Sequence, residues 1–199
     1  MAMSFYKKAF TDIYNSKSWD DGSGVLSGKG STVEYTVKYR KLLSIFIKTF
    51  KISSVVDLGC GDWTFSRLMD WDGLNYLGFD VVKSVIDANN KAYKKPNINF
   101  QLADFHDPNF KFPPAELYIL KDVLQHWPNL DIVKFLKRLI QSDKCLYILI
   151  TNCSNSDDPR SDIKIGDWKP LNPKLYPLKQ FKPQIIGVFD TKTTCVIVC

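Results

Sequence analysis

A glycine turn flanked by carboxylates is the first group of residues that could do chemistry. The run Val55-Val56-Asp57-Leu58-Gly59-Cys60-Gly61-Asp62 is typical of a buried strand that ends in a tight turn. Glycines in the turn let the backbone approach a ligand closely, because no side chain intervenes. In α/β sheets, ligands bind where strands end in this way. We therefore predict a ligand site formed by Asp57, Gly59, Gly61 and Asp62.

The charges beside this turn indicate the kind of ligand. A dinucleotide site has the pattern Gly-x-Gly-x-x-Gly and presents donors to a pyrophosphate, but the third glycine is missing here. Asp57 and Asp62 would repel phosphate, whereas they suit a ligand that carries an ammonium and a sulfonium group. The alternative interpretation of a Gly-x-Gly pair taken alone is an ordinary tight turn.

Acidic residues after the next two predicted strands extend this site. The second strand ends at Asp80, where doubly wound folds hold a ribose diol, and one carboxylate can accept hydrogen bonds from two hydroxyls. After the third strand, Asp104 could meet an adenine amino group and Phe105 could flank the base, although a loop cap is the alternative for Asp104. Val81, next to Asp80, is predicted to belong to the same site.

The order of these motifs carries a family resemblance. The fourth predicted strand ends in Lys121-Asp122-Val123-Leu124-Gln125-His126. Together with the turn and the two acidic positions, this loop resembles the class I S-adenosylmethionine-dependent methyltransferases over roughly residues 52–152. The stretches 59–63 (GCGDW) and 121–126 (KDVLQH) are similar to a subgroup of small bacterial and viral members. The resemblance implies an α/β, Rossmann-like, doubly wound and mostly parallel sheet of seven strands, with a C-terminal antiparallel hairpin.

The resemblance also implies a cofactor and the residues that hold it. The cofactor would be S-adenosylmethionine (AdoMet), and S-adenosylhomocysteine would be its product. The glycine turn would face the methionine part, Asp80 the ribose, and Asp104 with Phe105 the adenine. Lys121 would also belong to the cofactor site, and Tyr39 and Arg40 could reach the cofactor's carboxylate, although helix packing is the alternative for these two.

The predicted catalytic residues are His126 and Asp122, which the resemblance places near the transferred methyl. The imidazole of His126 titrates near neutral pH and could take a proton from an acceptor hydroxyl. The alternative is a histidine that caps the next helix. The sequence has no Asn-Pro-Pro-Tyr motif of base-amino methylation and no Asp/Asn cluster of a magnesium-dependent catechol site, so we expect no metal.

An α/β framework must position these residues. From Ile52 onward, short apolar runs alternate with helical stretches, which is typical of a parallel sheet covered by helices. Strands are predicted at 54–58, 75–79, 98–102, 117–120 and 146–150, and helices at 65–69, 84–94 and 130–141, the last capped by Asn129. Strands 185–189 and 194–198, joined by residues 190–193, are predicted to form the antiparallel hairpin.

The N-terminal fifty residues are predicted to lie outside this framework. The first thirty are rich in Gly, Ser and Asp, so they read as a loop that could act as a lid. Ser31 or Thr32 could then cap a helix whose apolar positions extend to Phe50. We expect a single methyltransferase domain over 1–199, with a lid and helical segment (1–50), a cofactor-binding core (51–152), and an acceptor-side loop and hairpin (153–199).

Composition supports an ordinary globular domain. The 199 residues are 45% hydrophobic and 24% charged, close to the averages for such domains. No stretch offers the ~20 apolar residues that cross a bilayer, and residues 1–10 lack the apolar core of a secretion signal, so we expect a cytoplasmic protein. The five cysteines contain no Cys-x-x-Cys pair, which argues against a zinc site or a disulfide framework.

The acceptor is the least determined part of the prediction. An aromatic rim of Trp19, Trp127 and Trp168 suits stacking on a sugar face, so we expect a hydroxyl or amine of a small polar acceptor such as a sugar. Thr151, Asn152 and a loop through Arg160 and residues 162–168 could cover its pocket. A net charge of +6 would also allow an RNA acceptor, although the lysines form no concentrated stripe. A non-catalytic, AdoMet-binding partner subunit is the third alternative.

Overall fold

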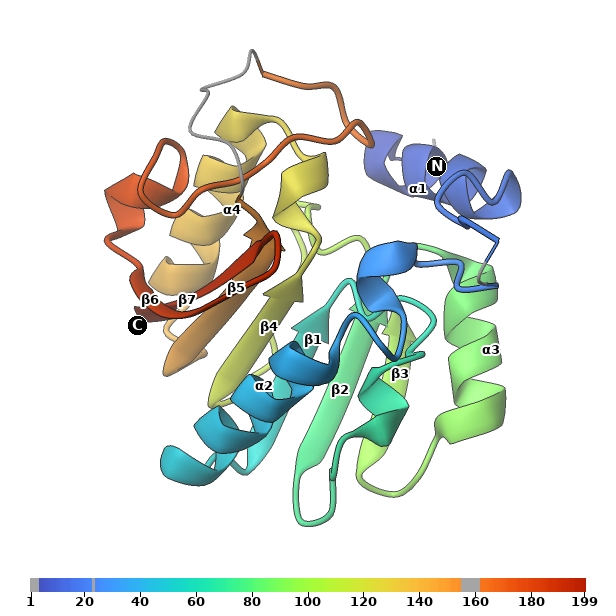
Figure 1. Cartoon of the computed structure of the whole chain (residues 1–199), viewed down its shortest axis with the longest axis horizontal. Helices are drawn as coiled ribbons and strands as arrows, with labels where there is room; N and C mark the ends of the chain where they lie inside the picture. Colours follow the sequence, from blue (N-terminus) through green and yellow to red (C-terminus); the bar gives the residue numbers. More distant parts are fainter. Residues whose placement is uncertain (1–3, 23, 155–161) are drawn as a thin grey trace. The chain divides into compact units, whose positions relative to one another are not determined.

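The computed structural model describes residues 4–22, 24–154 and 162–199 (Figure 1). The chain divides into two compact units, Met1–Phe110 and Lys111–Cys199. No helix among the described residues is both long and apolar enough to cross a bilayer. The predicted single methyltransferase domain, with its segment bounds at 50 and 152, stays a prediction.

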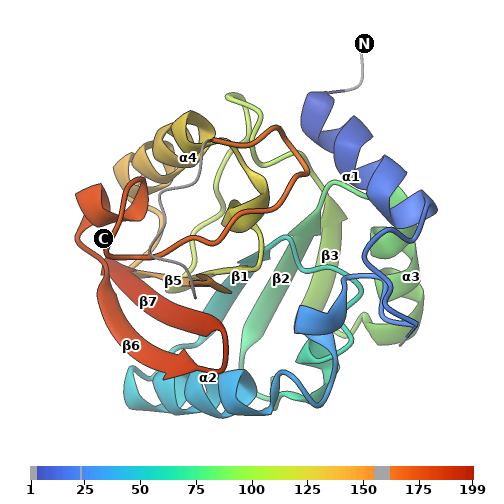
Figure 2. The same ribbon diagram turned by 45° about the horizontal axis from the view of Figure 1, so that its top comes forward.

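The first unit contains a parallel sheet with the strand order β3-β2-β1. Its strands are β1 (Ser54–Leu58), β2 (Asn75–Asp80) and β3 (Ile98–Leu102). Leu58 pairs with Phe79, and Asp80 pairs with Leu102, so the carboxyl ends of all three strands lie at the same edge. Helix α3 (Lys83–Tyr93) packs against β2 and β3, as Figure 2 shows.

The second unit contains four strands in the order β4-β5-β7-β6. They are β4 (Leu117–Lys121), β5 (Tyr147–Cys153), β6 (Gln184–Phe189) and β7 (Lys192–Val198). β4 and β5 are parallel, whereas β7 runs antiparallel to both β5 and β6. Helix α4 (Asn129–Gln141) buries one apolar stripe completely, which includes Ile132, Leu136 and Leu139. The predicted α/β class, with seven strands and a C-terminal antiparallel hairpin, is confirmed.

The strand predictions differ from the structure mainly at the ends. β1 and β3 have the predicted bounds, and β2 and β4 each extend one residue further. β5 begins one residue later than predicted and continues through Cys153. Only Asp190 and Thr191 separate β6 from β7, so the predicted four-residue link is wrong. Asp190 has a positive φ of 54°, which a tight hairpin turn requires.

The prediction of a loop for the first thirty residues is wrong, because α1 (Phe5–Asn15) occupies part of it. The Ser4 side chain accepts a hydrogen bond from the backbone N–H of Lys7 (3.1 Å) and so caps this helix. Tyr6 and Tyr14 are its buried residues. The overlooked signal is this pair, which lies on one helical face.

Three predictions about helices also need correction. Ser31 ends a short 3-10 turn, η1 (Lys29–Ser31), and Thr32 is extended, so α2 (Val37–Thr49) begins later than predicted. The predicted helix 65–69 is only a 3-10 turn, η2 (Ser66–Leu68). Asn129 is the first residue of α4 rather than its cap, and its backbone N–H donates to the Asp162 carboxylate (2.9 Å).

Candidate functional site

The glycine turn after β1 has a backbone that only glycine adopts easily. Gly59 and Gly61 have φ values of 81° and 57°. A Cβ atom on Gly61 would lie 2.4 Å from the Ser27 hydroxyl, so a side chain has no room there. The backbone N–H groups of Gly59 and Cys60 both donate to the carbonyl oxygen of Phe79, at 2.8 and 3.0 Å. The turn is therefore fixed against the end of β2.

Asp80, the last residue of β2, points its carboxylate at this turn. One oxygen accepts a hydrogen bond from the N–H of Gly61 (3.1 Å), and the other accepts from the N–H of Val82 (3.0 Å). Burial raises the pKa of Asp80 to about 6, although these hydrogen bonds act in the opposite direction. The structure thus brings the predicted ribose-binding carboxylate and the glycine turn together.

The two aspartates that flank the turn have different surroundings. Asp57 is buried and accepts a hydrogen bond from the Tyr76 hydroxyl (2.7 Å), which fixes it beneath the turn. Asp62 forms a reciprocal pair with Ser27: its N–H donates to the Ser27 hydroxyl (3.0 Å), and the Ser27 N–H donates to its carboxylate (3.2 Å). Tyr14 shares a further hydrogen bond with the Ser27 hydroxyl (2.8 Å).

Ser27, Tyr14 and Asn89 are therefore supports of the glycine turn that were not predicted from the sequence. The Asn89 side chain donates to the carbonyl oxygen of Gly61 (2.8 Å) from α3 and is almost completely buried. The sequence alone does not reveal this role, because it does not show which face of α3 packs against β2. The segment predicted as a lid is bonded to the turn through Ser27 in this structure.

The residues predicted to hold the adenine are engaged within the protein. Asp104 accepts hydrogen bonds from the His106 N–H (3.0 Å) and from the Ser4 hydroxyl, as the alternative of a loop cap suggested. Phe105 is buried, and Val81 lies in an apolar cluster that includes Tyr14. The assignment of Asp104 and Phe105 to the adenine, and of Val81 to the cofactor site, stays a prediction.

Tyr39 and Arg40 lie on α2. Tyr39 is almost completely buried and packs edge to face against Phe65, with ring centroids 5.7 Å apart. Arg40 donates to the carbonyl oxygen of Val33 (3.0 Å). Contact of either residue with a cofactor carboxylate stays a prediction.

In the second unit, Asp122 lies between two buried lysines. Its carboxylate contacts the ammonium of Lys121 at 2.6 Å and that of Lys192 at 2.5 Å. Asp122 has a positive φ of 59°, and its N–H donates to the carbonyl oxygen of Thr151 (2.8 Å), which attaches it to the end of β5. The strained backbone is thus held by two ion pairs and one backbone hydrogen bond.

These charges set the protonation state of the cluster. Burial raises the pKa of Asp122, but the two lysines outweigh burial and lower it below its usual value. Burial lowers the pKa of Lys192, but the Asp122 carboxylate and Cys153 outweigh burial and raise it. Asp122 and Lys192 are therefore both charged at neutral pH. Lys192 was missed because it was predicted to lie in the link 190–193, where a lysine usually faces solvent.

His126 is held in one tautomer by a backbone carbonyl. Its Nδ1 lies 3.0 Å from the carbonyl oxygen of Asp167, and because a carbonyl only accepts, Nδ1 carries the hydrogen. Nε2 is then the basic nitrogen of the neutral ring. Burial lowers the pKa of His126, against the opposing effects of Asp167 and Asp122, so the ring is neutral at pH 7. Pro128, not His126, caps α4.

The predicted aromatic rim is wrong in one member. Trp127 is only 1% exposed and packs edge to face against Phe135, so it cannot stack on an acceptor. Trp168 is 45% exposed, whereas Trp19 packs against Phe10 and Tyr14. Trp127 is buried because the chain turns into α4 directly after it, and Phe135 of that helix packs against its ring.

The acceptor-side loop is described only in part. Arg160 lies outside the described residues. Thr151 and Asn152 are both 1% exposed, and Asp162 pairs with the buried Lys169 at 2.8 Å. Within the described part of the chain, no group of three or more His, Cys, Asp or Glu residues could hold a metal ion.

Comparison with protein families and solved structures gives one family and one fold. A family model described as an O-methyltransferase domain matches residues 2–164. The structure of DhpI with S-adenosylhomocysteine covers 98% of this chain and 97% of its own, with 12% identity and a TM-score of 0.67. The N-methyltransferase NodS from Bradyrhizobium japonicum, also with S-adenosylhomocysteine, covers 96% and 98%, with 10% identity and a TM-score of 0.67.

A further similar structure is larger than this chain. Human N-acetylserotonin methyltransferase, solved with S-adenosylmethionine, matches 93% of this chain but only 61% of its own length, with 16% identity and a TM-score of 0.58. Identities this low show the fold alone. No curated protein matches the sequence.

Replacing Lys192 by Met should destabilise the protein by about 3 kcal/mol at pH 7, because a buried carboxylate loses one of its cations. The lysines lower the pKa of Asp122 from 3.8 in the folded state, so this stabilisation is present above 3.8 and is lost as the pH falls through the folded value. The variant should therefore lose stability at a higher pH on acidification. Urea unfolding from pH 3 to 8 measures both effects.

The exposed Lys137 on α4 provides the matched control, because Lys137→Met should change the free energy of unfolding by less than about 0.5 kcal/mol. Equal stability of Lys192→Met and Lys137→Met would show that the ion pair with Asp122 contributes nothing.

Proposed function

Since the chain belongs to the O-methyltransferase domain family, we propose that it transfers the methyl group of AdoMet to a hydroxyl of a small polar acceptor, for which a sugar is our candidate. The observation that carries the cofactor assignment is the hydrogen bond from Gly61 to Asp80. It joins a glycine turn that has no room for a side chain to a buried carboxylate. The neighbours DhpI and NodS were both solved with S-adenosylhomocysteine.

The residues of the first unit fit such a cofactor. The carboxylate of Asp80 is oriented by two backbone N–H groups and can accept further hydrogen bonds from a ribose diol, since each oxygen has two lone pairs. The turn at Gly59 and Gly61 would face the methionine part. Asp57 and Asp62 give this region the negative charge that an ammonium and a sulfonium favour.

When bound, AdoMet supplies an electrophilic methyl group on a positively charged sulfur. The protein has to hold the acceptor oxygen in line with that methyl, to exclude water and to accept the proton that the hydroxyl loses. We assign the proton to Nε2 of His126, because the carbonyl of Asp167 fixes the tautomer with that nitrogen basic.

Asp122 has a different role in this proposal. Its pKa is lowered by two lysines, so it is ionised throughout the neutral range and is a poor base. A fixed carboxylate can instead accept a hydrogen bond from the acceptor and orient it. The acceptor in this proposal therefore carries at least one hydrogen-bond donor besides the reacting hydroxyl, as sugars do.

Asp80→Asn should weaken binding of S-adenosylhomocysteine about 10- to 100-fold, because hydrogen bonds to a charged group are worth ~1.5–3 kcal/mol each. The pKa of Asp80 is raised to about 6, and ribose hydroxyls favour the ionised form. Affinity of the wild type should therefore rise with pH up to about 6 and be constant above it. Calorimetry from pH 5 to 8 measures the affinity of each protein and its dependence on pH. The variant should lack this pH dependence.

Asp72, which is exposed, serves as a matched control, and Asp72→Asn should bind S-adenosylhomocysteine as the wild type does. Unchanged affinity of Asp80→Asn would show that the ribose is not held by this carboxylate.

A screen of hydroxyl compounds, amines and RNA with methyl-labelled AdoMet tests the acceptor class. We expect label on a hydroxyl of a small polar compound, with sugars among the compounds tested. Label that appears only on RNA or on amines would contradict the proposal, and an absence of transfer to every class would favour a non-catalytic partner subunit.

His126→Ala should lower turnover on the identified hydroxyl acceptor by about 10²- to 10⁴-fold while affinity for S-adenosylhomocysteine stays nearly constant. Because burial lowers the pKa of His126 from 6.5, the wild-type rate should rise with pH through a value below 6.5 and then level off. The variant should lack this limb of the profile. Near-normal turnover by the variant would refute the assignment.

A further inference from the structure

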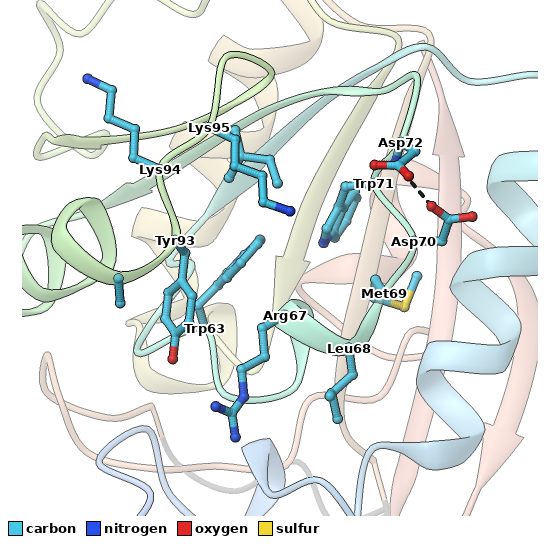
Figure 3. Close-up of a pocket in the computed structure, with 12 residues that line it drawn as sticks. Trp63, Arg67, Leu68, Met69, Asp70, Trp71, Asp72, Tyr93, Lys94 and Lys95 are labelled. Carbon is cyan, nitrogen blue, oxygen red and sulfur yellow. Dashed lines mark hydrogen bonds between the residues drawn. The ribbon is translucent and has the colours of Figure 1, made fainter.

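A pocket lies in the first unit, beside the segment that follows the glycine turn. Figure 3 shows this pocket of about 500 Å³, which is within the range of small-ligand sites. It is lined by Trp63, by residues 67–72, which precede β2, and by residues 92–95, which precede β3. It therefore lies toward the amino ends of these strands, whereas Gly61 and Asp80 lie at the carboxyl ends.

The floor of the pocket is apolar and aromatic. Trp63, Trp71 and Ile98 are buried and line it together with the partly exposed Tyr93. The rings of Trp63 and Tyr93 pack with centroids 5.1 Å apart. Because Trp63 and Trp71 are only 4% and 5% exposed, the partly exposed ring of Tyr93 is the one that a planar ligand could contact.

Hydrogen bonds fix the walls in this shape. The indole N–H of Trp71 donates to the carbonyl oxygen of Ser66 (2.7 Å). The Asn97 side chain donates to the carbonyl oxygens of Trp71 and Leu74, both at 2.9 Å. Lys95 and Ile98 exchange backbone hydrogen bonds of 2.9 and 3.1 Å. The pocket is therefore preformed, which lowers the entropic cost of binding.

The rim carries charged side chains that do not neutralise one another. Among the described residues, no ion pair involves any of the five charged residues of this rim, which are Arg67, Asp70, Asp72, Lys94 and Lys95. In Figure 3, the Lys95 side chain points toward Trp71, whereas Lys94 points away. The Arg67 guanidinium points away from Lys95, and the carboxylates of Asp70 and Asp72 lie on the side of Trp71.

We propose that this pocket binds a nucleoside monophosphate. The base would lie against the partly exposed ring of Tyr93, and the phosphate would pair with Lys95. Asp70 and Asp72 would accept hydrogen bonds from ribose hydroxyls or from an exocyclic amino group. A nucleotide offers a ring to the aromatic side chain, an anion to the lysine and hydrogen-bond donors to the carboxylates. Phosphate alone or a plain aromatic compound offers only one of these groups.

The test is calorimetry of the whole chain with AMP, GMP, CMP and UMP while saturating S-adenosylhomocysteine fills the cofactor site. We expect saturable binding of at least one nucleotide, about tenfold or more tighter than binding of its nucleoside, of ribose 5-phosphate or of inorganic phosphate. Lys95→Ala should weaken this binding about tenfold, because one charge-assisted hydrogen bond is lost. It should leave the affinity for S-adenosylhomocysteine unchanged.

Lys91 is the matched control, because it is exposed on α3 but does not line the pocket, and Lys91→Ala should change nucleotide affinity less than twofold. The proposal is overturned if no nucleotide binds saturably, if ribose 5-phosphate or the nucleoside binds as tightly as the nucleotide, or if Lys95→Ala binds as the wild type does. Should the chain fail to bind S-adenosylhomocysteine, the proposed function falls, while the Lys95 and Lys91 variants still decide the nucleotide site.

Discussion

The hydrogen bond between the Gly61 N–H and the Asp80 carboxylate is the interaction on which the candidate cofactor site depends. A buried carboxylate is unfavourable unless it is hydrogen-bonded, and the turn supplies one of its two backbone donors. The glycine turn can present the Gly61 N–H to Asp80 only because Gly61 has a positive φ and no side chain. Parallel pairing of β1 with β2 brings the two segments to the same edge of the sheet. Local backbone chemistry and sheet register therefore determine the site together.

A comparable constraint governs the second unit, where charge replaces backbone geometry. Asp122, Lys121 and Lys192 are buried or nearly so, and buried charges are tolerated when they are paired. Lys192 comes from the C-terminal hairpin, so the hairpin does more than extend the sheet: it provides a counter-charge for a residue at the end of β4. In the proposed mechanism, the ionised state of Asp122 leaves the role of base to the neutral imidazole of His126.

Sequence reasoning succeeded where a short pattern determines local structure. Alternation of apolar runs and helical stretches predicted the strands, and an acid after the second strand could be placed near the glycine turn because parallel strands end at one edge. It failed where a long-range contact decides. The burial of Lys192 depends on Asp122, which is 70 residues away along the chain. The burial of Trp127 depends on how the next helix, α4, packs against it through Phe135. Ser27 and Asn89 could not be assigned, since their roles appear only when separate segments meet at Gly61.

The central claim is that Asp80 and the glycine turn together hold AdoMet, and a crystal structure with S-adenosylhomocysteine at pH 7 tests it most directly. The account predicts both ribose hydroxyls within about 2.5–3.0 Å of the Asp80 carboxylate, with the methionine part against the backbone of Gly59 and Gly61. A ribose held by other residues, with Asp80 still bonded only to Gly61 and Val82, would contradict it.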